Sequence, residues 1–300
     1  MIDLHPLTLE DKQWIDPIVL AENSPSADYN FGNMFLWDET FHQHVGRLGD
    51  RMIVLPCYED KPFFSWPVGF GEIAPVFAQM QAYAKAQGFP FVLRGVTAEH
   101  LPTVHDLWGD DCTVIEERDL WDYLYTAEKL DTLSGKHLHG KRNHINRFVA
   151  ENDWQFAPLT EADFPACQAM LDAWMAACGE DEQDGIDDEY RAIQRAFANY
   201  DALGLEGGVL WVSGKPVAFT MGEIISADTF DAHFEKAYAN INGAYTMINR
   251  EFVRYIRSKH PQIQWINRED DTGRLSLRQS KLSYHPDKMV EKYKVVFPHE

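Results

Sequence analysis

The sequence of 300 residues has few cysteines, no long apolar run and no excess of positive charge. No apolar stretch approaches the ~20 residues that a membrane-spanning helix needs, so no integral membrane segment is expected. The amino terminus has no basic segment followed by an apolar stretch, so no secretory signal is predicted. The cysteines form no CxxC pair, which argues against a zinc ribbon or a disulfide scaffold and favours reduced thiols in the cytoplasm. These cysteines are Cys57, Cys112, Cys167 and Cys178.

The shortage of positive charge also restricts the partners. The formal net charge is -20, whereas a protein that coats DNA needs clustered lysine and arginine for phosphate contacts, so no DNA partner is expected. Basic residues nevertheless gather in two segments, residues 136–147 and residues 250–294. Local basic segments on an acidic chain predict a site for an anionic ligand group. Solvated helix faces are the alternative.

What the sequence has is ample material for a packed core, because 45% of its residues are hydrophobic and 13% are aromatic. In the second half, periodicity and turn residues predict helices, a hairpin with its turn at 213–215, and further strands. The helices are expected at 133–151, 161–178, 187–200, 243–258 and 273–282. The strands are expected at 208–212, 216–225, 229–238, 263–267 and 289–297.

The first half repeats part of this order. Its strands are expected at 51–58, 63–66, 91–94 and 112–125, and its helices at 72–87 and 98–108. In both halves a long helix precedes the next strand by nearly the same spacing, 72 to 91 and 243 to 263. We therefore predict an α/β (α+β) protein with a duplicated unit, in which mixed, mainly antiparallel sheets are flanked by helices. The domains would be residues 1–127 and 128–300, with one large sheet as the alternative.

Five segments add a more specific signal. They are residues 28–37, 136–148, 233–237, 267–273 and 277–286. With the element order of the second half, they resemble a family of bacterial proteins grouped with the C-terminal domain of phosphatidylglycerol lysyltransferases. The resemblance implies tandem GNAT-like domains, that is, the acyl-CoA N-acyltransferase fold. The related lysyltransferases move an amino acid from aminoacyl-tRNA to a lipid headgroup, and Fem-type peptidoglycan-bridge enzymes share the architecture.

Two departures from these relatives affect the expected substrates. The lysyltransferases carry a large membrane-embedded portion that this sequence lacks, which argues against a lipid acceptor. GNAT enzymes bind the CoA pyrophosphate with backbone N–H groups of a glycine-containing turn that begins with Arg or Gln and opens a helix. The corresponding stretch here, residues 238–244, has one glycine, Gly243, and neither Arg nor Gln at its start. The use of CoA is therefore left open.

Acyl transfer needs a base for the acceptor's proton and a positive or N–H group for the developing oxyanion. In the strand at 229–238, the two-residue repeat of a β-strand puts His233 and Glu235 on one face and Lys236 on the other. We predict that His233 and Glu235 are the catalytic residues and that Lys236 binds substrate. The alternative is that Glu235 pairs with an arginine and stabilises the sheet.

Polar residues also follow the short strand at 263–267, at a strand-to-helix turn where α/β proteins commonly bind ligands. Asn267, Arg268, Glu269 and Asp270 are predicted to bind substrate, and the consecutive acids suit an ammonium group. Helix capping is the alternative for the residues that follow. No metal site is predicted, because the spacing matches no metal-binding loop.

Two further groups complete the predicted substrate site. Arg142, Asn143 and Asn146 lie on the helix at 133–151, where they could bind a phosphate or the acceptor end of a tRNA; a polar surface stripe is the alternative. Arg278, Lys281 and Tyr284 lie on or just after the helix at 273–282. Lys281 could neutralise a donor phosphate or carboxylate, whereas Tyr284 could simply pack.

These observations predict an acyl- or aminoacyl-transferase that acts on the amine or hydroxyl of a small-molecule acceptor, with its site in the second domain. The donor would be acyl-CoA or aminoacyl-tRNA, and no resident cofactor is assigned. Two alternatives stay open. One is a non-catalytic binding module for a small amino-acid-like or anionic ligand, and the other is an acyl-CoA-dependent N-acetyltransferase.

Overall fold

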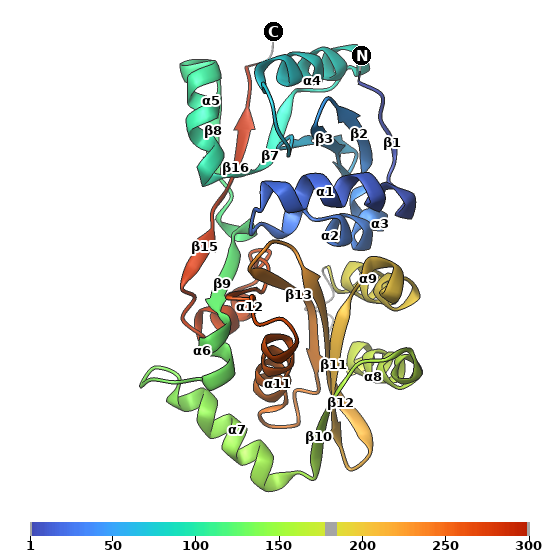
Figure 1. Cartoon of the computed structure of the whole chain (residues 1–300), viewed down its shortest axis with the longest axis vertical. Coiled ribbons are helices and arrows are strands. Elements are labelled where there is room, and N and C mark those ends of the chain that lie inside the picture. Colours follow the sequence, from blue (N-terminus) through green and yellow to red (C-terminus); the bar gives the residue numbers. More distant parts are fainter. Residues whose placement is uncertain (1, 178–184, 299–300) are drawn as a thin grey trace. The chain divides into compact units, whose positions relative to one another are not determined.

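The computed structural model describes residues 2–177 and 185–298, and its chain divides into two compact units (Figure 1). The first unit contains residues 1–122 together with 270–275 and 289–300. The second unit contains residues 123–269 and 276–288. The chain thus leaves the first unit close to the expected boundary at residue 127. It then returns to that unit twice near its carboxyl end, so neither unit is a continuous stretch of sequence.

The amino-terminal half contains short strands and mostly short helices. Its strands are β1 (His5–Pro6), β2 (His44–Leu48), β3 (Arg51–Leu55), β4 (Cys57–Tyr58), β5 (Lys61–Pro62), β6 (Phe64–Ser65), β7 (Val92–Thr97), β8 (Thr113–Glu116) and β9 (Asp122–Thr126). Its helices are α1 (Lys12–Glu22), α2 (Phe31–Leu36), α3 (Asp38–Phe41), α4 (Ala74–Gln87) and α5 (Leu101–Trp108).

In the first unit, β1, β2 and β3 form one antiparallel sheet. A second sheet has the order β6-β7-β16-β8, in which the carboxy-terminal strand β16 (Lys292–Val296) pairs antiparallel with both β7 and β8. Lys292 of β16 is buried, and its Nζ lies 2.7 Å from Asp122 and 2.8 Å from Asp28. The last strand of the chain therefore contributes both sheet pairing and a buried ion cluster to the first unit.

The carboxy-terminal half has longer elements. Its helices are α6 (Ala127–Thr132), α7 (His139–Glu151), α8 (Phe164–Ala177), α9 (Ile186–Ala198), α10 (Tyr200–Leu203), α11 (Ala244–Lys259) and α12 (Leu275–Leu282). Its strands are β10 (Trp154–Pro158), β11 (Glu206–Val212), β12 (Lys215–Ile224), β13 (Thr229–Ala237), β14 (Trp265–Asn267), β15 (Lys288–Val290) and β16.

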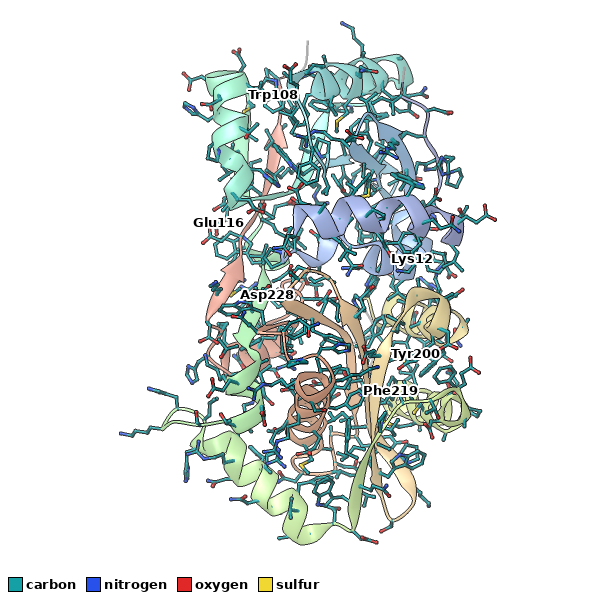
Figure 2. All side chains as sticks on the ribbon, viewed as in Figure 1. Lys12, Trp108, Glu116, Tyr200, Phe219 and Asp228 are labelled. Carbon is teal, nitrogen blue, oxygen red and sulfur yellow. The ribbon has the colours of Figure 1, made fainter. Side chains whose placement is uncertain are left out.

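The second unit is built on a seven-stranded sheet of order β10-β11-β12-β13-β14-β9-β15 (Figure 1). β13 and β14 are parallel, whereas the pairs from β10 to β13 and the pair β14–β9 are antiparallel. Phe252 of α11 packs on Phe230 of β13, and Phe197 of α9 packs on Phe219 of β12 (Figure 2 labels Phe219). Because Phe219 and Phe252 are both buried, aromatic contacts between helices and strands form much of this core.

The register between β12 and β13 is irregular where β13 approaches the site. It shifts between Met221 and Glu223, where the single residue Gly222 of β12 lies opposite two residues of β13, Ala232 and His233. A Cβ atom on Gly222 would lie 1.9 Å from the backbone oxygen of Asp231, so only glycine allows this close approach. An added residue of this kind bends a strand and redirects the side chains that follow it. His233 lies within this irregular segment of β13, and Glu235 follows it.

The predicted class, mixed α/β with mainly antiparallel sheets flanked by helices, is confirmed. One predicted strand is wrong: residues 112–125 form two separate strands, β8 and β9, joined by a 3-10 turn at Arg118–Leu120. β8 pairs with β16 and β9 pairs with β14, so the two strands belong to different sheets. The predicted final strand is likewise divided into β15 and β16. Cys178, the end of one predicted helix, lies outside the described residues.

Across residues 2–177 and 185–298, every helix is either too short or too polar to cross a lipid bilayer.

Candidate functional site

The candidate site lies where β13 and β14 stop pairing. The two strands pair in parallel only through Thr229–Asp231 and Trp265–Asn267. β14 ends at Asn267, whereas β13 continues to Ala237. Side chains from the later part of β13 and from the segment after Asn267 can therefore lie between the two backbones. The structure brings Glu235 and Arg268 together there.

Glu235 and Arg268 form a largely buried ion pair. Arg268 Nη2 lies 3.1 Å from Glu235 Oε1, and Asn249 Nδ2 of α11 donates to Glu235 Oε2 at 2.8 Å. The side chains of Arg268 and Glu235 are 10% and 13% exposed. Arg268 Nη1 and Asn249 Oδ1 are buried and have no hydrogen-bond partner among the described residues. The cluster thus has one buried donor and one buried acceptor that make no hydrogen bond to the described residues. Buried polar atoms of this kind are commonly satisfied by a ligand or a water.

Aromatic rings and a lysine hold Arg268 in place. Its guanidinium lies over the rings of Tyr284 and Tyr125, 5.0 and 5.9 Å from their centroids. Lys281 Nζ donates to the backbone oxygen of Arg268 at 2.5 Å, and the Tyr125 hydroxyl donates to the backbone oxygen of Lys281. These contacts fix the turn after β14. Lys281 and Tyr284, both predicted as site residues, therefore reach the cluster by holding Arg268.

Lys141 of α7 also reaches this cluster, although the sequence analysis did not select it. Its Nζ lies 3.8 Å from the centroid of the Tyr284 ring. The pKa of Lys141 is lowered to about 8, mainly by burial and also by the positive charge of Arg268, whereas Glu235 acts in the opposite direction. An amine with this pKa is partly neutral near neutral pH and can take up a proton. Ile145 and Phe148 are buried on the same helix, so their spacing from Lys141 was a signal that could have identified it.

The residues predicted on α7 lie elsewhere. Arg142 donates hydrogen bonds to the backbone oxygens of Leu133 and Gly135, which ties down the start of the helix. Asn143 and Asn146 are exposed, and Asn143 Nδ2 lies 3.3 Å from His139 Nδ1 on the same helix. The structure therefore does not bring these three side chains to Glu235 and Arg268.

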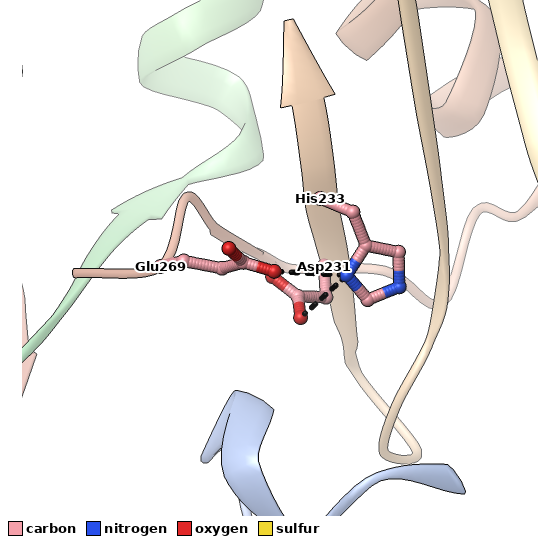
Figure 3. A group of neighbouring side chains, drawn as sticks. All are labelled: Asp231, His233 and Glu269. Atoms are coloured by element: carbon pink, nitrogen blue, oxygen red, sulfur yellow. Dashed lines mark hydrogen bonds and ion pairs between the residues drawn. The ribbon is translucent and has the colours of Figure 1, made fainter. Parts of the chain in front are cut away.

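His233 has a different environment from Glu235. Its side chain is completely buried and lies among three carboxylates. Nε2 is 3.0 Å from Glu223. Nδ1 is 2.9 Å from Glu269 and 3.5 Å from Asp231, the two carboxylates that Figure 3 draws. Burial lowers the pKa of the ring, but Asp231, Glu223 and Glu269 together raise it well above the usual value. His233 and Glu235 therefore have separate sets of partners in the part of the chain that is described.

The remaining predicted residues are divided between several places. Lys236 forms an ion pair with Glu189 at 2.7 Å and lies 4.0 Å from the ring of Trp174, so it binds the helices α8 and α9. Asn267 Oδ1 accepts from the backbone N–H of Glu269, and Asp270 Oδ1 accepts from that of Thr272. Asp270 belongs to the first unit, and Arg278 is half-buried on α12.

A cavity of about 510 Å³ lies between α7 and the amino-terminal end of α11. Its lining has three basic side chains from α7 and includes no carboxylate. The lining residues are Lys141, His144, Arg147, Ala239, Asn240, Ile241, Asn242, Gly243, Ala244, Tyr245 and Thr246. The N–H groups that begin a long helix, together with nearby basic side chains, favour an anion. The cavity lies along the stretch at 238–244, which the sequence analysis compared with a phosphate-binding turn. The basic side chains in its lining come from α7.

Gly243 allows this cavity to form. Its φ is +83°, and a Cβ atom there would lie 2.5 Å from the backbone oxygen of His144. Only glycine combines this left-handed conformation with so close an approach. His144 Nδ1 also lies 3.0 Å from Asn242 Oδ1, which joins α7 to the loop before α11. Because Lys141 lines the cavity and also contacts Tyr284, it links the cavity to the cluster around Arg268.

Comparison with known proteins identifies the family of this chain. The family model "Phosphatidylglycerol lysyltransferase, C-terminal" matches residues 21–296. A conserved protein of unknown function from Bacteroides thetaiotaomicron has a crystal structure with a TM-score of 0.94. It is 33% identical to this chain over 99% of this chain and 100% of its own.

More distant structures share the fold. L-PGS from Bacillus licheniformis is 15% identical with a TM-score of 0.65, over 98% of this chain and 93% of its own. A tandem GNAT protein from the clavulanic acid biosynthesis pathway is 10% identical with a TM-score of 0.53, over the full length of both chains. These likenesses confirm the predicted tandem GNAT-like fold. The family model covers most of the sequence, and the chain belongs to the phosphatidylglycerol lysyltransferase C-terminal family.

Proposed function

We propose that this protein is an acyl- or aminoacyl-transferase. The cavity between α7 and α11 would bind a phosphate group of the donor, and transfer would take place at the cluster of Glu235, Arg268 and Lys141. The observation that carries the proposal is the position of Lys141, which lines the cavity and also lies on the ring that packs against Arg268. The family and the fold, which are those of lysyltransferase C-terminal regions and GNAT-like acyltransferases, support the same class of reaction.

The residues have distinct roles in this proposal. The acceptor's nitrogen or oxygen attacks the carbonyl carbon of the donor, the carbonyl oxygen becomes an oxyanion, and the bond to the leaving oxygen or sulfur then breaks. Arg268 Nη1, which is buried and has no hydrogen-bond partner within residues 2–177 and 185–298, would stabilise the oxyanion. Lys141 would take the acceptor's proton and return it to the leaving group.

Glu235 was predicted as a catalytic base, and the proposal gives it another role. Both of its oxygens already accept hydrogen bonds, from Asn249 and Arg268. These two bonds hold the carboxylate against Asn249 and Arg268. Glu235 is therefore proposed as a positioning residue that orients Arg268. His233, enclosed by carboxylates, is proposed to take no direct part in the transfer and to affect it only by holding the backbone of β13.

The donor and the acceptor are also proposals. Acyl-CoA and aminoacyl-tRNA both carry an activated carbonyl and phosphate groups in one molecule, and both are found in the cytoplasm, where we expect this protein to act. A small amine or hydroxyl compound is the proposed acceptor. The name of the family points to lysyl transfer to phosphatidylglycerol, so vesicles that contain this lipid are included in the test.

The test uses the full chain with two labelled donors, acetyl-CoA and a mixture of aminoacylated tRNAs, and with small amines or lipid vesicles as acceptors. One donor should transfer its label. Lys141→Met should lower kcat by about 100-fold or more, the usual contribution of a general base. Arg147→Ala should mainly raise KM for the donor. Arg191→Ala is the control, because Arg191 pairs with Asp188 on α9 and does not line the cavity.

The outcomes separate the possible functions. Transfer from acetyl-CoA alone would identify an N-acetyltransferase, whereas transfer from aminoacyl-tRNA would identify an aminoacyltransferase. If neither donor transfers its label but a donor or an amino acid raises the melting temperature, the chain is a binding module and the proposed reaction is wrong. The reaction is equally contradicted if Lys141→Met transfers at the rate of the unchanged protein.

A further inference from the structure

We propose that Asp231, His233 and Glu269 form a binding site for one divalent transition-metal ion, with Glu223 as the carboxylate that holds the ring of His233. The site would stabilise the junction between β13 and the segment after β14. This proposal does not depend on the transferase reaction. It departs from the sequence analysis, which predicted no metal site.

The ligand atoms lie close enough for one ion. His233 Nδ1 is 2.9 Å from Glu269 Oε1 and 3.5 Å from Asp231 Oδ2, and the three ligand atoms all lie within 4.8 Å of one another (Figure 3). In a tetrahedral site with bonds of about 2 Å, ligand atoms are about 3.3 Å apart. Movements of about 1 Å in these side chains would therefore complete the coordination.

The histidine separates this group from an ordinary cluster of acids. The His233 ring is 0% exposed, and its Nε2 faces Glu223 Oε1 at 3.0 Å. With Nε2–H donating to Glu223, Nδ1 is the ring nitrogen that faces Asp231 and Glu269. A ligating histidine whose other nitrogen donates to a carboxylate is the usual arrangement in metal sites, because it fixes the tautomer and the orientation of the ring.

The charge of the cluster also favours a cation. Glu223, Asp231 and Glu269 are three carboxylates around one ring, and Asp231 is 0% exposed. A divalent ion would neutralise two of these negative charges. Uncompensated charge is costly to bury, so the ion lowers the free energy of the folded chain. Glu269, which is 19% exposed, offers the route of entry.

The chemistry of the ligands narrows the choice of ion. One imidazole nitrogen with two carboxylates suits zinc, manganese, cobalt or ferrous iron, whereas calcium and magnesium prefer oxygen ligands alone. The spacing in the sequence could not reveal the site. Asp231 and Glu269 are distant in the chain, and they meet because Asp231 pairs with Asn267 in the parallel register of β13 and β14.

The experiment counts metal ions on the full chain, prepared without a histidine tag and stripped with a chelator. The protein is incubated with Zn²⁺, Mn²⁺ or Co²⁺, separated from free ions by gel filtration, and analysed by elemental and native mass spectrometry. We expect one retained ion per chain and a higher melting temperature. His233→Ala and Glu269→Gln should each lose that ion, and Co²⁺ should give a visible absorption band that both variants lack.

A matched control tests adventitious binding by other histidines. His260 pairs with Glu206 at 2.5 Å elsewhere in the same unit, so His260→Ala should keep the ion. The proposal is overturned if the unchanged protein retains no ion with any of the three metals. It is also overturned if Glu269→Gln retains as much metal as the unchanged protein. Should His233→Ala fail to fold, the more exposed Glu269 decides the result.

Discussion

Arg268 pairs with Glu235 across the gap that opens where β13 and β14 stop pairing, with 3.1 Å between Nη2 and Oε1. The pair joins the end of one strand to the turn after its neighbour. The sequence analysis left open whether Glu235 is a base or pairs with an arginine, and the structure contains that arginine pair. The pair therefore has a structural role, in addition to any role in transfer.

Removing one partner of this pair should destabilise the protein. Glu235→Ala leaves the largely buried guanidinium of Arg268 without its partner, and such a loss typically costs about 3–5 kcal/mol. The double variant Glu235→Ala with Arg268→Met should lose less than the sum of the single variants, because no unpaired charge remains. Urea denaturation measures each free energy of unfolding. Additive losses would mean that the two side chains do not interact in solution.

The pKa of Lys141 should respond to its neighbours with opposite signs. Because Glu235 raises this pKa and Arg268 lowers it, Glu235→Gln should move it below about 8 and Arg268→Gln should move it above. NMR of the ¹³C-methylated lysine gives the values. The unfolded chain keeps this proton up to about pH 10.4, so Lys141 should make the free energy of unfolding rise between about pH 8 and that value. A titration near pH 10.4 in the folded protein would contradict the buried position.

Gly243→Ala should damage the cavity beside α11. The backbone at this position has a left-handed conformation, which costs about 1–2 kcal/mol for a residue with a Cβ atom. The added methyl group would also lie 2.5 Å from the backbone oxygen of His144. The helix α7 would have to move away, which separates Lys141 and His144 from the start of α11. We expect a lower melting temperature and weaker binding of inorganic pyrophosphate by calorimetry. Gly214→Ala is the comparison, because its added Cβ meets no atom within 4 Å although its φ is also positive.

In the first unit, Lys292→Met should be strongly destabilising. Lys292 is 1% exposed and neutralises Asp122 and Asp28, so its loss removes the cation that compensates the buried carboxylate of Asp122. The expected cost is about 3–5 kcal/mol. Adding Asp122→Asn should recover part of that loss. Hydrogen exchange should show the largest loss of protection in β7 and β16, and unchanged exchange in those strands would contradict the role assigned to Lys292.

Local patterns predicted most of the long elements of the second half, although the helix expected at 133–151 begins only at His139. The helix expected at 243–258 is α11 (Ala244–Lys259), because its apolar residues recur at helical spacing on one buried face. The hairpin of β11 and β12 was predicted from its turn residues. The strand expected at 112–125 was wrong because its limits depend on distant strands and not on the local pattern. Its two parts pair with β16 and β14, and the identity of these distant partners decides where each strand ends.

In the candidate site too, some residues were predicted from the sequence and others depend on tertiary contacts. Arg268, Lys281 and Tyr284 were selected from the sequence, and the structure brings them together. Lys141 was missed because its importance depends on burial beside Tyr284. His233 and Glu235 were predicted as a pair from the two-residue repeat of a strand, yet they have separate partners. The register shift opposite Gly222 interrupts the regular alternation that this prediction assumed.

The amino-acid sequence by itself determined the class of fold, the family and most of the long helices and strands, because periodicity, turn chemistry and family motifs are properties of neighbouring residues. Only the tertiary structure decided which charged groups meet. The carboxylates around His233, the partner of Glu235 and the low pKa of Lys141 depend on residues far apart in the chain, because pairing and desolvation act through space.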